Sequence, residues 1–108
     1  MIDWTTVQDV ERFDVDQLDD ERPFDVDRQA GHLLKHPGLG LEDIGDVWSS
    51  DPLFYPAMPP AHWLMVAEVA DRALAVPLAP SGNGDRRRCR PIGCVAAAHL
   101  ARRYQEDR

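Results

Sequence analysis

An arginine cluster is the part of this sequence best suited to chemistry. The stretch GDRRRCRPIGC, residues 84–94, has arginine at four of the five positions 86–90. A guanidinium group is a planar fork of N–H donors that binds phosphate or carboxylate through two hydrogen bonds. Side chains two positions apart on a strand share a face, so Arg88 and Arg90 are predicted to hold one phosphate. A solvated surface, or a charged guard against sheet pairing, is the competing explanation of the cluster.

Two other pairs of residues are candidates for the same site. Lys35 and His36 end a predicted helix, where they could approach the arginines or could simply complement the helix dipole. His62 begins a predicted strand and can titrate near neutral pH. The adjacent Trp63 could stack on a base, although a histidine beside a tryptophan often has a structural role instead.

The charge of the chain is divided unevenly. The protein has 19 acidic and 12 basic residues and a net charge of −7. Residues 1–27 contain ten acidic and two basic residues, so they carry −8, whereas residues 28–108 carry +1. All excess negative charge therefore precedes the arginine cluster, and we interpret residues 1–27 as an internal counterpart that covers it.

The composition excludes several other classes of protein. No apolar run approaches the ~20 residues needed to cross a bilayer, and the acidic N-terminus does not resemble a secretory signal. We therefore expect a cytoplasmic protein without membrane contact. Cys89 and Cys94 are predicted to be small buried residues rather than a disulfide or zinc ligands. The histidines lack metal-ligand spacing, so neither a metal nor a cofactor is predicted.

Hydrophobic periodicity predicts helices and strands in a mixed order. Apolar residues at helical spacing predict helices, whereas two-residue alternation and compact apolar runs predict strands. Helices are expected at residues 5–13, 28–36, 39–51 and 96–108, and strands at 23–27, 62–69, 73–80 and 86–95. Strands 62–69 and 73–80 are expected to form a hairpin joined at Asp71 and Arg72. The predicted fold is α+β: a three-stranded antiparallel meander plus a short N-terminal strand, with helices packed on one face and a C-terminal helix. An acidic helix and linker, residues 1–22, would precede an α+β domain of residues 23–108.

The region from residue 23 to residue 106 resembles the BrnT-type toxins of the RelE-like ribonuclease superfamily. The resemblance depends on short motifs in the family's order: Phe24 and Asp27, Lys35-His36, Leu41-Glu42-Asp43, Asp51-Pro52, the stretch RCRPI at 88–92, and Tyr104. It implies the toxin component of a bacterial type II toxin–antitoxin system that cleaves messenger RNA, ribosome-associated or free, without a metal. A cognate antitoxin protein would neutralise it, and a homo-oligomer is left open.

The resemblance also suggests roles for the candidate residues. Lys35, His36, Arg88 and Arg90 would be catalytic, and Arg86, Arg87, His62 and Trp63 would bind RNA. Several family features are missing: His32 replaces an asparagine, residues 93–95 lack arginine, Leu100-Ala101 stands where a glutamate is usual, and the chain is acidic. These departures keep a second hypothesis open, a catalytically inactive protein-binding module on the same scaffold.

Overall fold

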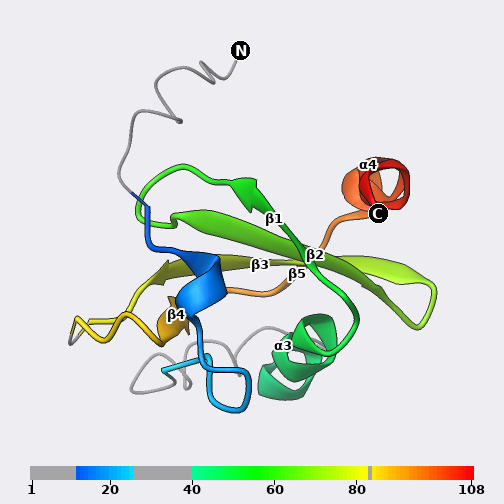
Figure 1. The fold of residues 1–108 in the computed structure, drawn as a ribbon. Helices are drawn as coiled ribbons and strands as arrows, with labels where there is room; N and C mark the ends of the chain where they lie inside the picture. The colour runs from blue at the N-terminus through cyan, green and yellow to red at the C-terminus, as the bar shows by residue number, and fades with distance from the viewer. Residues whose placement is uncertain (1–11, 26–39, 83) are drawn as a thin grey trace.

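The computed structural model describes residues 12–25, 40–82 and 84–108, and it has the α+β class that the sequence predicts. Figure 1 shows a central sheet with helical elements on both sides. In chain order the elements are η1 (Val15–Gln17), α3 (Leu41–Trp48), β1 (Leu53–Pro56), β2 (Trp63–Val69), β3 (Arg72–Pro80), β4 (Cys89–Pro91), β5 (Val95–Ala96), η2 (Ala98–Leu100) and α4 (Ala101–Asp107).

The predicted meander forms the centre of an antiparallel sheet. The strand order is β1-β2-β3-β4, and β5 pairs with β3 beyond the end of β4. The β2–β3 hairpin is confirmed, but its turn consists of Ala70 and Asp71, one residue earlier than expected, because Val69 pairs with Arg72. Both turn residues have positive φ, 52° and 65°, which is the backbone of a two-residue hairpin turn that matches strand twist.

The strand predicted at 86–95 is divided into β4 and β5. Pro91 ends β4 because it has no N–H to continue the ladder, and the chain turns away before it pairs again at Val95. A methyl group added at Gly93 would lie 3.8 Å from the Pro77 ring, so the chain passes closely over β3 there. The edge strand β1 was not predicted, since its four residues lie between Pro52 and the terminal Pro56 and show no clear alternation.

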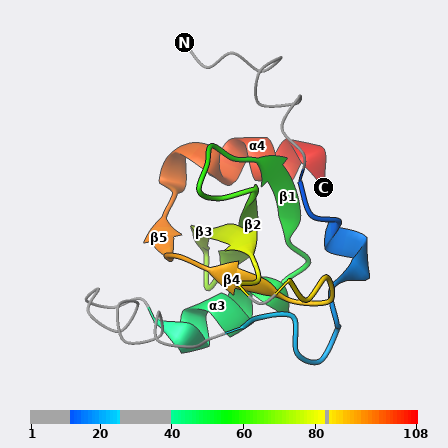
Figure 2. The ribbon, with the colours of Figure 1, turned by 90° about the vertical axis from the view of Figure 1, so that its left-hand side faces the viewer.

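The two α-helices lie on opposite faces of the sheet (Figures 1 and 2). Ile44 and Val47 of α3 are fully buried against one face, and Tyr104 of α4 is buried against the other. Helix α3 confirms the prediction at 39–51; it begins after Gly40, whose N–H donates to the Asp43 carboxylate at 2.7 Å. The predicted C-terminal helix is also confirmed as η2 followed by α4.

The acidic segment before the sheet packs onto it. Leu18 is 6% exposed and belongs to the core, and the Trp63 indole N–H donates to the Phe13 carbonyl oxygen at 2.8 Å. Phe24 forms an isolated parallel bridge with Cys89, which is the described part of the strand predicted at 23–27. Residues 12 and 13 are not helical, and the rest of the helix predicted at 5–13 lies outside the described residues, as does the one predicted at 28–36.

Both cysteines are free and buried, as the sequence predicts. Burial raises the pKa of the Cys89 thiol from 9.0 to about 12 and that of Cys94 to about 11, where Asp43 adds a smaller effect in the same direction. Because the folded protein holds these protons more tightly than the unfolded chain, their contribution to stability is complete below pH 9 and is lost as the pH rises toward 12.

We therefore predict that the protein resists thiol reagents and becomes less stable in alkali. At pH 8, Cys89 is expected to react with a small alkylating reagent about 10³-fold more slowly than a free cysteine, because its thiolate fraction is lower by that factor. Mass spectrometry after timed alkylation measures the rate, and the denatured protein is the control. Rapid labelling of the native protein at both sites would contradict the burial of the thiols.

Candidate nucleic-acid interface

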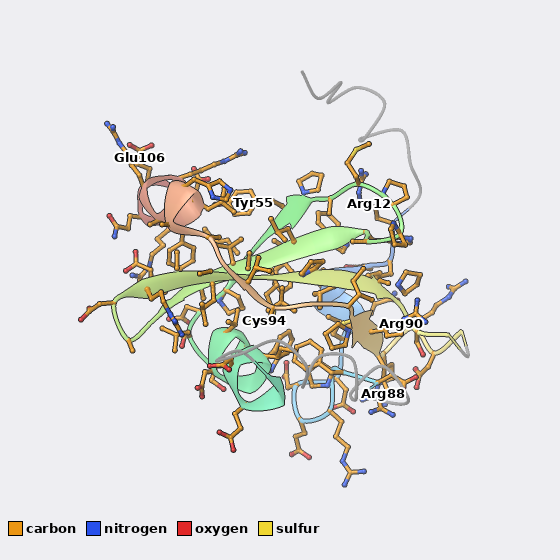
Figure 3. All side chains as sticks on the ribbon, turned by 180° about the vertical axis from the view of Figure 1, so that it is seen from behind. Arg12, Tyr55, Arg88, Arg90, Cys94 and Glu106 are labelled. Atoms are coloured by element: carbon orange, nitrogen blue, oxygen red, sulfur yellow. The ribbon has the colours of Figure 1, made fainter. Side chains whose placement is uncertain are left out.

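The arginines predicted to bind an anion lie at one end of the sheet. Arg90 is in β4, and Arg86, Arg87 and Arg88 are in the loop that leads into it. His62 lies at the same end, because its N–H donates to the carbonyl oxygen of Leu78, whose partner in β4 is Pro91. Figure 3 shows Arg12, Arg88 and Arg90 at this end, whereas Tyr55 and Glu106 lie at the opposite side of the molecule. We call Arg12, His62, Arg86, Arg87, Arg88 and Arg90 the basic end.

A cavity of about 430 Å³ at the basic end brings together groups far apart in the sequence. Arg12, His62 and Arg86 line it together with Phe13, Asp14 and Gln17. Two guanidinium groups and an imidazole around one hollow make a donor-rich site for a phosphate. Asp14 opposes them, although one of its carboxylate oxygens already accepts the Asp16 N–H at 2.9 Å.

The acidic segment fixes the orientation of His62. The imidazole Nδ1 accepts the backbone N–H of Phe13 at 3.1 Å, and the two rings stack with centroids 5.4 Å apart. With Nδ1 acting as an acceptor, the neutral ring carries its proton on Nε2. His62 is therefore held as an Nε2–H donor, a state that can bind a phosphate oxygen or release a proton.

Arg12 is a site residue that the sequence analysis missed. Its Nε donates to the His62 carbonyl oxygen at 3.0 Å, and its guanidinium carbon lies 5.8 Å from the centre of the Trp63 ring. The available signal was an arginine among many acidic residues, but its distance of 50 positions from His62 hid the contact. Trp63 is half-buried beneath Arg12 and donates to Phe13, so it supports the site rather than offering an open ring to a base.

Arg87 contacts the described part of the acidic segment. Its guanidinium forms an ion pair with Asp19 at 3.2 Å, and the Asp19 N–H donates to the Arg87 carbonyl oxygen at 2.8 Å. The pKa of Asp19 is lowered, chiefly by the backbone N–H groups of Glu21 and Arg22 and to a smaller extent by the charge of Arg87. Because the arginine side chain is 71% exposed, this ion pair is solvated and readily opened.

The same segment continues along the outer edge of β4. The Cys89 N–H donates to the Pro23 carbonyl oxygen at 2.8 Å, and the Asp25 N–H donates to the Cys89 carbonyl oxygen at 2.7 Å. The Arg88 guanidinium donates to the Phe24 carbonyl oxygen at 2.6 Å. Residues 19–25 therefore lie beside residues 87–89, as expected for an internal counterpart, while the contribution of residues 1–11 lies outside the described part of the chain.

The prediction that Arg88 and Arg90 share one strand face is wrong. Strand β4 begins at Cys89, so Arg88 precedes it and lies beside Ile44 and Gly45 of α3. Arg90 pairs with Ala79, on the side of the sheet that carries Tyr55 and faces α4. The Nε atoms of both arginines are buried, and no described residue accepts a hydrogen bond from them. The other predicted catalytic residues, Lys35 and His36, lie outside the described residues.

Other kinds of site find little support in the described ranges. Within residues 12–25, 40–82 and 84–108, no three His, Cys, Asp or Glu side chains are grouped as metal ligands would be. Among the helices of those ranges, none has the length and apolar character to cross a membrane. No protein-family model matches the sequence, and no curated protein or solved structure matches the chain.

Proposed function

We propose that the basic end binds the phosphate backbone of RNA and that the chain is a BrnT-type, RNA-cleaving toxin held in check by a cognate antitoxin protein. The observation that supports this proposal most is the meeting of Arg12, Arg86 and His62 around one cavity. Cations in such an arrangement neutralise the scissile phosphate and its developing charge. The resemblance of residues 23–106 to the toxin family supplies the kind of substrate.

RNA cleavage without a metal needs a base, an acid and an oriented phosphate. The 2′-oxygen attacks the phosphorus as a base takes its proton, and the 5′-oxygen leaves with a proton from the acid. His62 is suited to be the acid because its proton lies on Nε2, as the Nδ1 contact with Phe13 requires. The base would come from Lys35 or His36, the residues that the resemblance places in the catalytic site.

A specific observation favours the second candidate function, a non-catalytic protein-binding module. Arg87 and Arg88 are engaged by Asp19 and by the Phe24 carbonyl oxygen within the same chain. A basic surface that is partly covered by its own acidic segment is less available to RNA. The departures of the sequence from the toxin motifs agree with this alternative.

Induced expression in a bacterial host separates the two functions. We expect the wild-type chain to arrest growth, and the double variant Arg86→Ala/Arg90→Ala to restore it. Arg102→Ala is the matched control, since this arginine is 91% exposed on α4 and pairs only with Glu106 among the described residues. Arrest by all three proteins would disconnect toxicity from the basic end. Healthy growth at high expression of the wild type would favour the binding module.

A second variant tests the chemical role of His62. In His62→Asn the side-chain oxygen can still accept the Phe13 N–H, while the titratable proton is removed. We expect RNA binding to persist and cleavage of a fluorescent RNA in EDTA to fall by about 10²–10⁴-fold, the usual contribution of general acid catalysis. Full cleavage by this variant would assign the acid to another residue.

A further inference from the structure

A second and larger cavity lies along the outer edge of β1. It has a volume of about 730 Å³ and is bounded by η1, by the end of α3 and by the C-terminal residue (Figure 2). We call this cavity the β1 groove. No residue lines both the β1 groove and the cavity at the basic end. Asp14 and Gln17 face the basic end, whereas Val15 and Asp16 face the β1 groove, so η1 separates the two.

The floor and walls of the β1 groove are apolar and aromatic. Trp48 and Phe54 form its aromatic part, with ring centroids 6.5 Å apart and planes at 68°. The Trp48 indole N–H donates to the Asp20 carbonyl oxygen at 3.3 Å, which fixes the ring against the segment that follows η1. Leu18 and Leu53 add aliphatic surface. Apolar stems of long side chains would gain burial here.

The rim of the groove is acidic. Asp16, Asp20 and Asp51 line it, all three of them exposed, against the single cation Arg108. Within the described residues, none of the three carboxylates forms an ion pair. The local excess of negative charge repels a nucleic-acid backbone and attracts a cation, the opposite preference to that of the basic end.

We propose that the β1 groove docks a basic, extended segment of a partner protein. Lysine or arginine stems of that segment lie on Trp48 and Phe54, and their charged heads reach the carboxylates of Asp16, Asp20 and Asp51. Cations and aromatic rings already combine in this way elsewhere in the chain, where Arg103 lies 4.7 Å from the centre of the Tyr55 ring. Strand β1 ends the sheet path, but Pro52 and Pro56 limit its pairing, so side chains rather than a new ladder supply the affinity.

The proposal does not depend on RNA binding, and its test uses the full chain with two synthetic peptides. A fluorescent peptide of alternating lysine and leucine is the probe, and its glutamate–leucine counterpart is the negative probe. We expect the basic peptide to bind, and the triple variant Asp16→Asn/Asp20→Asn/Asp51→Asn to weaken it about 10-fold or more, as three partly screened ion pairs allow. Asp51 has a positive φ of 53°, a backbone conformation that asparagine also tolerates, so the substitution preserves the fold there.

A matched control separates the groove from general charge attraction. Glu42→Gln/Asp46→Asn removes two exposed charges from α3 that do not line the groove, and its effect on peptide affinity should be less than about 2-fold. Trp48→Leu should weaken the peptide without changing RNA affinity. Equal binding of the acidic peptide, or equal losses in the control and triple variants, would overturn the proposal. Self-association that the triple variant abolishes would also overturn it, because the occupant would then be a second copy.

Discussion

Tyr104→Ala is expected to lower the free energy of unfolding by about 3–5 kcal/mol, the usual cost of truncating a buried aromatic side chain. Tyr104 is 1% exposed and joins α4 to the chain that follows α3 through its hydroxyl, which donates to the carbonyl oxygens of Ser50 at 3.1 Å and Asp51 at 2.8 Å. The ring therefore fills the core while its hydroxyl satisfies two backbone acceptors. Removal of both functions threatens a domain whose total stability is of the order of 5–15 kcal/mol.

The more conservative Tyr104→Phe separates packing from hydrogen bonding. It is expected to cost about 1–2 kcal/mol, because the ring remains and two acceptors lose their donor. Tyr55→Phe is the matched control, since its hydroxyl donates to the exposed Asp107 carboxylate at 2.9 Å, where water can replace it. Urea unfolding followed by tryptophan fluorescence measures both. Equal losses at the two positions would show that the Tyr104 hydroxyl does not secure α4.

Arg86→Ala/Arg90→Ala is expected to weaken single-stranded RNA binding about 100-fold at about 50 mM salt. Each phosphate contact on a single strand contributes a slope of about −0.7 to the dependence of log affinity on log salt, which is about 10-fold in affinity at this concentration. The double variant should therefore also reduce that slope by about 1.4. Fluorescence anisotropy across a salt series measures both quantities, with Arg102→Ala as the control. Unchanged affinity in the double variant would place RNA elsewhere on the molecule.

The same assay tests the internal counterpart. Asp19→Asn removes the charge that pairs with Arg87 and keeps the segment in place, so RNA affinity should rise several-fold and the salt dependence should steepen. Deletion of residues 1–22 would be a poor test, because Leu18 belongs to the core and Phe13 supports both His62 and Trp63. An Asp19→Asn protein with wild-type RNA affinity would exclude a shielding role for this contact.

The two proposed surfaces give this small chain opposite electrostatic preferences on either side of η1. RNA binding at the basic end and peptide docking in the β1 groove can therefore be lost separately. The asparagine variants of the groove leave every arginine of the basic end unchanged, and the Arg86→Ala/Arg90→Ala variant leaves every residue of the groove unchanged. Failure of one proposal is thus distinguishable from failure of the other.

Local patterns determined much of the fold. The alternation at residues 73–80 and the apolar run at 62–69 predict β2 and β3, because burial of a strand leaves a clear trace in its sequence. Pro52 and the spacing of Ile44, Val47 and Trp48 similarly predict α3. The four residues of β1 and the two of β5 leave no such trace, because their pairing with longer strands, rather than their own pattern, makes them strands.

For the functional surfaces, the sequence by itself determined which charged groups exist and that the arginines cluster at 86–90. Only the tertiary structure decided that Arg88 and Arg90 leave the end of the sheet on different sides, since this depends on where β4 begins. It also decided that Arg12 and His62 join Arg86 around one cavity, and that Asp20 lies beside Trp48. These groups are separated by tens of residues, and contacts at such separation come from sheet pairing and core packing, which no local spacing encodes.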